Sequence, residues 1–207
     1  MRTPPLEAWL SVAGPTQAAR EAGTGLLRRY AEPHRRYHTG AHLAVVLAHV
    51  DDLAGWADDP RAVRLAGWFH DAVYDPLRVD NEVRSGRLAE RVLPTLGLDP
   101  PLVSRVARLV RLTAGHAPDA GDADGAVLCD ADLAVLAGSP QVYAAYVDAV
   151  RAEYAALDEA TWRRGRGEVV RTLLLRDPLY RTPPARVGWT DQARANLAGE
   201  LAGLALS

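Results

Sequence analysis

The sequence predicts an all-α fold, a single-domain bundle of roughly eight to ten helices. Apolar residues recur at helical spacing along nearly the whole chain, as at Leu43, Val46, Leu47 and Val50. Strand-like alternation is almost absent, and the good helix formers Ala, Leu, Arg and Glu dominate these segments. With 207 residues, of which 48% are hydrophobic, the chain is long enough to bury one proper core.

Proline and glycine separate the expected helices. The periodic apolar residues mark helices around 43–50, 62–69, 88–96, 102–110 and 191–201. The breaks between helices fall at Gly14–Pro15, Pro33, Asp59–Pro60, Asp75–Pro76, 97–101, 115–125, 138–140, Pro178 and Pro183–Pro184. Asp59, Ser139 and Thr190 each have the chemistry of a helix start. We expect one domain over 1–207, with a motif core at about 35–136 and C-terminal helices at 139–207 packing on it.

Composition and charge narrow the classes of partner. The chain has 24 basic and 26 acidic residues, and the basic ones are scattered, so neither a nucleic-acid polymer nor a membrane is an expected partner. The single cysteine, Cys129, excludes an intramolecular disulfide and a cysteine-rich zinc site. No window reaches the ~18 apolar residues of a membrane helix, and the N-terminus lacks a secretory signal. These features favour a cytoplasmic protein.

The pair His70–Asp71 directly follows the apolar run 62–69, at the end of a helix that should be buried in the core and without water. A buried carboxylate is costly unless something compensates its charge, and a divalent cation would do so. Two more blocks with metal-binding side chains flank the pair. His42 leads directly into an apolar helix, which suits a ligand. Asp132 is the expected last ligand, in what looks like the opening of a helix, with Asp130 as the alternative that helix capping explains better.

Other polar residues are candidates for catalysis or substrate binding. His38 lies four residues before His42, on the same face if the block is helical, and nearer to solvent, which suits a general acid. The alternative is a solvated histidine at the helix start for His38 and a hydrogen-bonded core histidine for His42. Glu82 could orient a water or an imidazole, although it also fits an ordinary helix cap. The predicted catalytic residues are His38, Asp71 and Glu82, and the predicted substrate-binding residues are Arg35, His116 and Asp75.

The donor set defines the expected cofactor. Two imidazoles and two carboxylates suit a divalent ion such as Mn, Fe, Mg, Co, Ni or Zn, and a second ion is left open. Such an ion activates water and neutralises a phosphoryl oxygen, so hydrolysis of a phosphate ester is the reaction it serves best. The expected partner is a small phosphorylated substrate, either a nucleotide or another metabolite. A homodimer is left open.

The ordered set His42, His70–Asp71 and Asp132 resembles the HD-domain superfamily of metal-dependent phosphohydrolases, in its bacterial-type members. The block Tyr37–His42 is similar to a signature of the cyclic nucleotide phosphodiesterases in that superfamily, and this resemblance implies that His38 is the proton donor and Asp132 the last ligand. Thr39 stands where those enzymes have Asn, and their histidine-rich continuation after the His–Asp pair is replaced by 72–75. Two other classes remain open: a catalytically silent protein that senses a metal or nucleotide, and a di-iron oxygenase.

Overall fold

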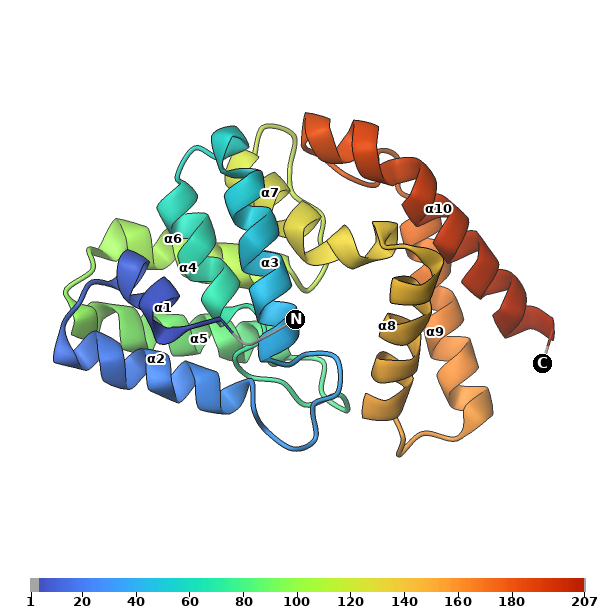
Figure 1. The fold of residues 1–207 in the computed structure, drawn as a ribbon, viewed down its shortest axis with the longest axis horizontal. Helices are drawn as coiled ribbons and strands as arrows, with labels where there is room; N and C mark the ends of the chain where they lie inside the picture. Colours follow the sequence, from blue (N-terminus) through green and yellow to red (C-terminus); the bar gives the residue numbers. More distant parts are fainter. Residues whose placement is uncertain (1–3, 207) are drawn as a thin grey trace.

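The computed structural model describes residues 4–206, so residues 1–3 and 207 of the predicted domain lie outside it. Within that range every regular element is a helix and none is a strand, so the predicted all-α bundle is confirmed (Figure 1). The α-helices are α1 (Leu6–Ala13), α2 (Gln17–Arg29), α3 (Gly40–Asp52), α4 (Pro60–Phe69), α5 (Asn81–Val92), α6 (Pro100–Leu112), α7 (Ala123–Asp132), α8 (Pro140–Glu153), α9 (Glu159–Leu174) and α10 (Pro183–Leu206). Three short 3₁₀ helices join them: η1 (Ala54–Trp56), η2 (Leu93–Leu96) and η3 (Leu133–Ala137).

Side-chain caps and prolines fix most helix starts. Asp59 and Ser139 accept hydrogen bonds from backbone N–H groups three residues later, and each precedes a proline at the first helical position, as predicted. The predicted start at Thr190 is wrong. Helix α10 begins at Pro183, where proline is tolerated, and runs through Thr190, whose hydroxyl donates to the carbonyl of Arg186 inside the helix.

Two hydrophobic clusters fill the interior. The first is built from α1 to α7, and the second from η3, α8, α9 and α10 with the segment before α10. Trp189 of α10 packs against both, with its ring 5.1 Å from the His49 ring and 5.4 Å from the Tyr180 ring. In Figure 1, α8 and α9 form a pair at one end of the molecule, and α10 runs along the same end.

Helices α3, α4 and α7 contact one another in pairs within the first cluster. Each contributes large buried residues to that cluster, such as Leu43, Trp68 and Leu128. Because all three are held by apolar burial along their length, their ends are fixed relative to one another. This packing positions the polar side chains at those ends.

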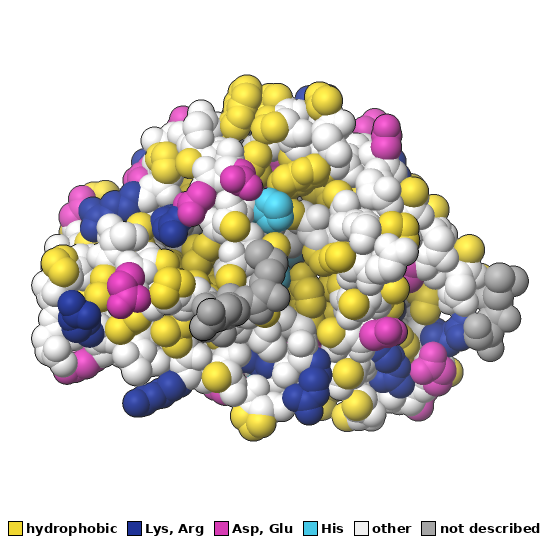
Figure 2. Space-filling view, viewed as in Figure 1, with side chains coloured by type: hydrophobic (Ala, Val, Ile, Leu, Met, Phe, Trp, Pro, Cys, Tyr) yellow, Lys and Arg dark blue, Asp and Glu magenta, His cyan; other side chains and the backbone are white. Residues whose placement is uncertain are grey.

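The surface carries mixed charge. Figure 2 shows basic and acidic side chains scattered over one face of the molecule, with no patch of a single sign covering it. Among the helices that the structure describes, none has both the length and the apolar character needed to cross a membrane.

Candidate metal centre and cleft

Three helix ends bring His42, His70 and Asp132 together. His42 lies in the first turn of α3, whose start is capped by the Thr39 side chain accepting from the Ala41 N–H. His70 is the residue that caps the C-terminus of α4, and Asp132 is the last residue of α7. The two histidines are 6% and 1% exposed, so their convergence is a feature of the interior.

The distances between these side chains fit a shared cation. The Nε2 atom of His42 lies 3.2 Å from His70 Nε2 and 3.1 Å from Asp132 Oδ1, and His70 Nε2 lies 3.5 Å from the same oxygen. Ligand atoms about 2.1 Å from one ion and at right angles to each other lie about 3 Å apart. The three ligand atoms lie within 4.8 Å of one another and could hold a metal ion.

The ring orientation of His70 also suits a ligand. Its Nδ1–H donates to the carbonyl of Gly67 at 2.7 Å, which places the proton on that nitrogen and leaves a lone pair on Nε2. This lone pair faces the second imidazole and the Asp132 carboxylate. A backbone carbonyl holding the far nitrogen is the usual support of a metal-bound histidine.

Asp71 contacts the same two imidazoles. Its Oδ2 atom lies 3.4 Å from His42 Nε2 and 3.1 Å from His70 Nε2. Its backbone carbonyl accepts a hydrogen bond from Arg35 at 2.8 Å, which fixes the turn after α4. Asp71 therefore lies beside the three side chains, His42, His70 and Asp132, whose ligand atoms could share one ion.

The electrostatics of the cluster show why it needs a compensating positive charge. Burial opposes the charge on each group, but the neighbouring carboxylates outweigh burial and raise the pKa of His42 and, further, that of His70. The histidines in turn hold the pKa values of Asp71 and Asp132 well below the usual range. A bound divalent ion would supply the positive charge that the imidazole protons otherwise provide to the two carboxylates.

The structure separates the two aspartates of α7. The sequence-based expectation that they open a helix is wrong, because α7 begins at Ala123 with an Asp122 cap and both aspartates lie in its last turn. Asp130 points away from the histidines and accepts from the N–H groups of Arg181 and Thr182 and from the Thr182 hydroxyl. Asp132 lies at the negative end of the helix dipole, where a carboxylate is unfavourable without cationic partners.

His38 lies beside the cluster but outside the helix. Helix α3 begins at Gly40, so His38 and His42 do not share a helical face, and the predicted helical spacing is wrong for this pair. Their rings are nevertheless 5.7 Å apart. The Nδ1–H of His38 donates to Glu153 Oε2 at 2.6 Å, and its Nε2 has no hydrogen-bond partner among the residues that the structure describes. The side chain is 22% exposed.

Glu153, at the end of α8, holds the segment that carries His38. Its Oε1 atom accepts from the backbone N–H groups of Arg36, Tyr37 and His38 at 2.7, 2.8 and 3.0 Å. Its Oε2 atom also accepts from the Tyr74 hydroxyl at 2.8 Å. Burial alone would raise the pKa of Glu153, but the His38 ring and these N–H groups lower it to about 2. The carboxylate is therefore ionised where it accepts from the His38 Nδ1–H.

The cluster opens into a cleft of about 860 Å³. His38, Asp71 and Asp132 line it, together with two further predicted site residues, Glu82 and His116. His116 Nε2 lies 2.8 Å from Asp132 Oδ2, on the carboxylate oxygen that does not face the other histidines. Burial, together with the charges of Asp71 and Asp132, raises the pKa of Glu82.

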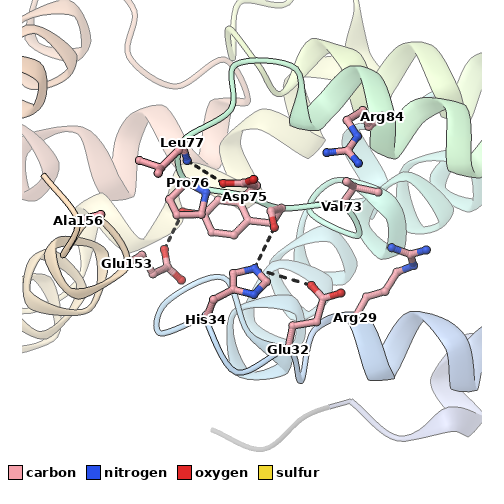
Figure 3. A pocket seen from close by; sticks show the side chains of 11 residues that line it. Arg29, Glu32, His34, Val73, Asp75, Pro76, Leu77, Arg84, Glu153 and Ala156 are labelled. Atoms are coloured by element: carbon pink, nitrogen blue, oxygen red, sulfur yellow. Dashed lines mark hydrogen bonds and ion pairs between the residues drawn. The ribbon is translucent and has the colours of Figure 1, made fainter.

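Two predicted substrate-binding residues lie elsewhere. The Arg35 side chain is fully buried, and its guanidinium donates to Glu32 and to the carbonyls of His38 and Asp71, so it is a structural anchor and not a phosphate ligand. Asp75 lines a separate hollow of about 500 Å³ (Figure 3), where its carboxylate accepts from the Leu77 N–H. Asp75 lies directly before Pro76 in the loop between α4 and α5, and it is absent from the lining of the cleft beside the metal cluster.

Glu153 and Tyr74 are functional candidates that sequence reasoning missed. Figure 3 shows Glu153 on the wall of the hollow that contains Asp75. Its Oε2 atom accepts a hydrogen bond from the Tyr74 hydroxyl. Glu153 lies 115 residues from His38 along the chain, and its only signal is an acidic residue at the C-terminus of a helix, where the dipole disfavours it.

Comparison of the chain with protein-family models, with curated proteins and with solved structures finds no match. The resemblance to the HD-domain superfamily therefore remains a prediction that depends on the residues themselves.

Proposed function

We propose that the chain is a metal-dependent phosphohydrolase of the HD type that cleaves a phosphate ester of a small metabolite. One observation carries the proposal. Two imidazole nitrogens and two carboxylate oxygens converge within a few ångströms at the floor of a cleft, and a histidine held by a carboxylate lies next to them. This arrangement combines a cation site with a proton donor, the two components that ester hydrolysis needs.

His42, His70, Asp71 and Asp132 would hold the ion. Imidazole and carboxylate donors in this number favour a first-row transition metal or Mg²⁺ over Ca²⁺, which prefers more oxygen ligands. When bound, the ion would lower the pKa of a water molecule and neutralise charge on a phosphoryl oxygen. The ring of Tyr37, 4.7 Å from the His42 ring, helps to shield this side of the cluster from solvent.

His38 would protonate the leaving group. Because Glu153 binds its Nδ1–H, the proton that can be transferred is the one on Nε2, the nitrogen without a protein partner in the described structure. The leaving oxygen of an ester would take that proton as its bond to phosphorus breaks. Glu153 stays ionised and compensates the positive imidazole before the transfer.

Glu82 is the proposed acceptor for the proton of the attacking water. Burial and the nearby carboxylates raise its pKa, which brings it closer to the range where a carboxylate exchanges protons at neutral pH. His116 contacts Asp132 from the cleft side and is placed to donate to a phosphate oxygen.

Two measurements test the proposal. Elemental analysis of protein prepared without added metal should find a divalent ion, and His70→Ala should lose it. Wild-type protein should release phosphate from at least one member of a panel of nucleotides and simple phosphate esters, and His70→Ala should not. Bound iron and oxygen consumption without phosphate release would favour the oxygenase alternative. A bound ion or nucleotide without either activity would favour the sensor.

A further inference from the structure

One part of the cleft wall is apolar and aromatic. It is formed mainly by η3, α8 and α9, and its side chains include Tyr146, Tyr154, Leu157, Trp162, Val169 and Leu173. The rings of Tyr154 and Trp162 lie 5.4 Å apart, with Tyr154 half-buried and Trp162 buried behind it. Val169 is 49% exposed, so part of this surface is open to whatever enters the cleft.

The basic side chains that line the cleft are already engaged. Arg166 binds Glu200 with two nitrogens at 2.7 and 3.0 Å and the Tyr146 hydroxyl with a third at 3.0 Å. Arg176 donates to the carbonyls of Gly115 and His116. Arg78 is paired with Asp80. Arg166 and Glu200 form a buried pair, so a second phosphate could bind Arg166 only by breaking that pair, whereas an uncharged group needs no basic partner.

We propose that this wall binds the alcohol part of the substrate, and that this part is an uncharged group with an aromatic ring. The substrate class is then a monoester with a single phosphate on a ring-bearing alcohol, in preference to a polyphosphate or a small sugar phosphate. This inference depends on the proposed phosphate-ester hydrolysis for its chemistry, while the binding surface itself is a property of α8 and α9. Aromatic side chains favour such rings through both burial and ring–ring contact.

The first test compares 2-phenylethyl phosphate with ethyl phosphate. Both are esters of primary alcohols, so the ratio of their kcat/KM values reports binding of the ring. Burial of one phenyl ring predicts a ratio on the order of 50-fold in favour of 2-phenylethyl phosphate. Adenosine triphosphate should be a poor substrate. A ratio near one, or faster hydrolysis of the triphosphate, would overturn the inference and leave the proposed hydrolysis standing.

Gly165 of α9 offers a variant that fills the cleft. It lines the cleft, and a Cβ built on it meets no atom within 4 Å. Gly165→Leu should therefore lower the ratio to about fivefold or less, because the new side chain takes the space of the ring. Gly199→Leu is the matched control, since Gly199 is an exposed helical glycine of α10 that also has open space around it. Val169→Asn provides a second variant and should lower the ratio as well.

A binding measurement separates failure of this inference from failure of the proposed function. Saturation-transfer NMR with 2-phenylethanol, which has no phosphate, should detect binding to wild-type protein and to Gly199→Leu, and a weaker signal with Gly165→Leu. If wild-type protein hydrolyses neither ester but shows this pattern, the proposed function fails and the binding wall stands. If wild-type protein does not bind the alcohol, or Gly165→Leu binds it equally well, the inference is wrong whatever the activity.

Discussion

Replacing Glu153 with glutamine should make the stability of the protein less dependent on pH. The carboxylate accepts three backbone hydrogen bonds from residues 36–38 and two more from His38 and Tyr74. Burial works against its charge, but these partners lower its pKa from 4.5 to about 2. Glutamine has nearly the same shape, but it cannot ionise, and its NH₂ group cannot replace the second accepting oxygen.

The sign and size of the effect follow from this pKa. Because the pKa is lower in the folded than in the unfolded chain, the stabilisation is fully present above 4.5 and is lost as the pH falls toward 2. At about 1.4 kcal/mol per pH unit, the shift of the pKa from 4.5 to about 2 stabilises the folded protein by about 3 kcal/mol at neutral pH. About 2 kcal/mol of this stabilisation is lost at about pH 3. Wild-type protein should therefore exceed Glu153→Gln in unfolding free energy by about 2 kcal/mol more at about pH 7 than at about pH 3.

Urea unfolding of the metal-free proteins at both pH values measures this difference directly. Glu21→Gln is the control, because Glu21 is exposed on α2 and, among the residues that the structure describes, its carboxylate hydrogen-bonds only to the Gln17 side chain. Its stability relative to wild type should change little with pH. An equal gap between wild type and Glu153→Gln at both pH values would refute the reasoning, since it would mean that the ionised carboxylate is not what holds residues 36–38.

Three further substitutions test the roles that the structure gives to other residues. Asp132→Asn should contain no divalent ion in elemental analysis. It should also lose the stabilisation that added Mn²⁺ gives to wild type, about 2.7 kcal/mol when the free Mn²⁺ concentration is about a hundred times its Kd. Asp130→Ala should lower the unfolding free energy measured in urea by about 3 kcal/mol, because buried N–H groups before α10 lose their acceptor. The variant should still bind the ion, and loss of the ion would contradict the choice of Asp132 over Asp130 as the ligand. Arg35→Met should lower the melting temperature together with kcat, because it removes buried hydrogen bonds worth about 1.5–3 kcal/mol each. An Arg35→Met variant with wild-type stability and a raised KM would restore the phosphate-clamp interpretation.

The sequence predicts the all-α bundle, and it singles out His42, His70 and Asp132, whose side chains the structure brings together, because both depend on local signals. Helical periodicity and proline placement depend on a few neighbouring residues, and they predict the starts of α4 and α8 correctly. The pair His70–Asp71 was informative because a polar pair at the end of an apolar helix is costly to bury. The start of α7 was missed, since its glycine- and aspartate-rich first turn looks like loop, although Asp122 caps it.

The remaining site residues depend on contacts between distant segments. A guanidinium such as that of Arg35 can bind phosphate, and a carboxylate such as that of Asp75 can bind a polar substrate group. Their side chains are instead held by neighbours that the sequence does not identify, such as Glu32 and Leu77. The only local signal of Glu153 is its place at the C-terminus of α8, where the helix dipole disfavours an acidic residue, and this signal does not identify its partners. Its role arises only because the end of α8 meets the segment before α3.

The candidate site lies where the two hydrophobic clusters meet. The metal-binding side chains come from the ends of α3, α4 and α7 in the first cluster, whereas the partner of His38 comes from α8, whose Tyr143 belongs to the second. The Tyr146 ring of α8 also lies 4.7 Å from the Tyr37 ring, which contacts His42. The proton donor and the cation site are therefore brought together by packing between the clusters, and neither cluster alone contains the arrangement that the proposed hydrolysis requires.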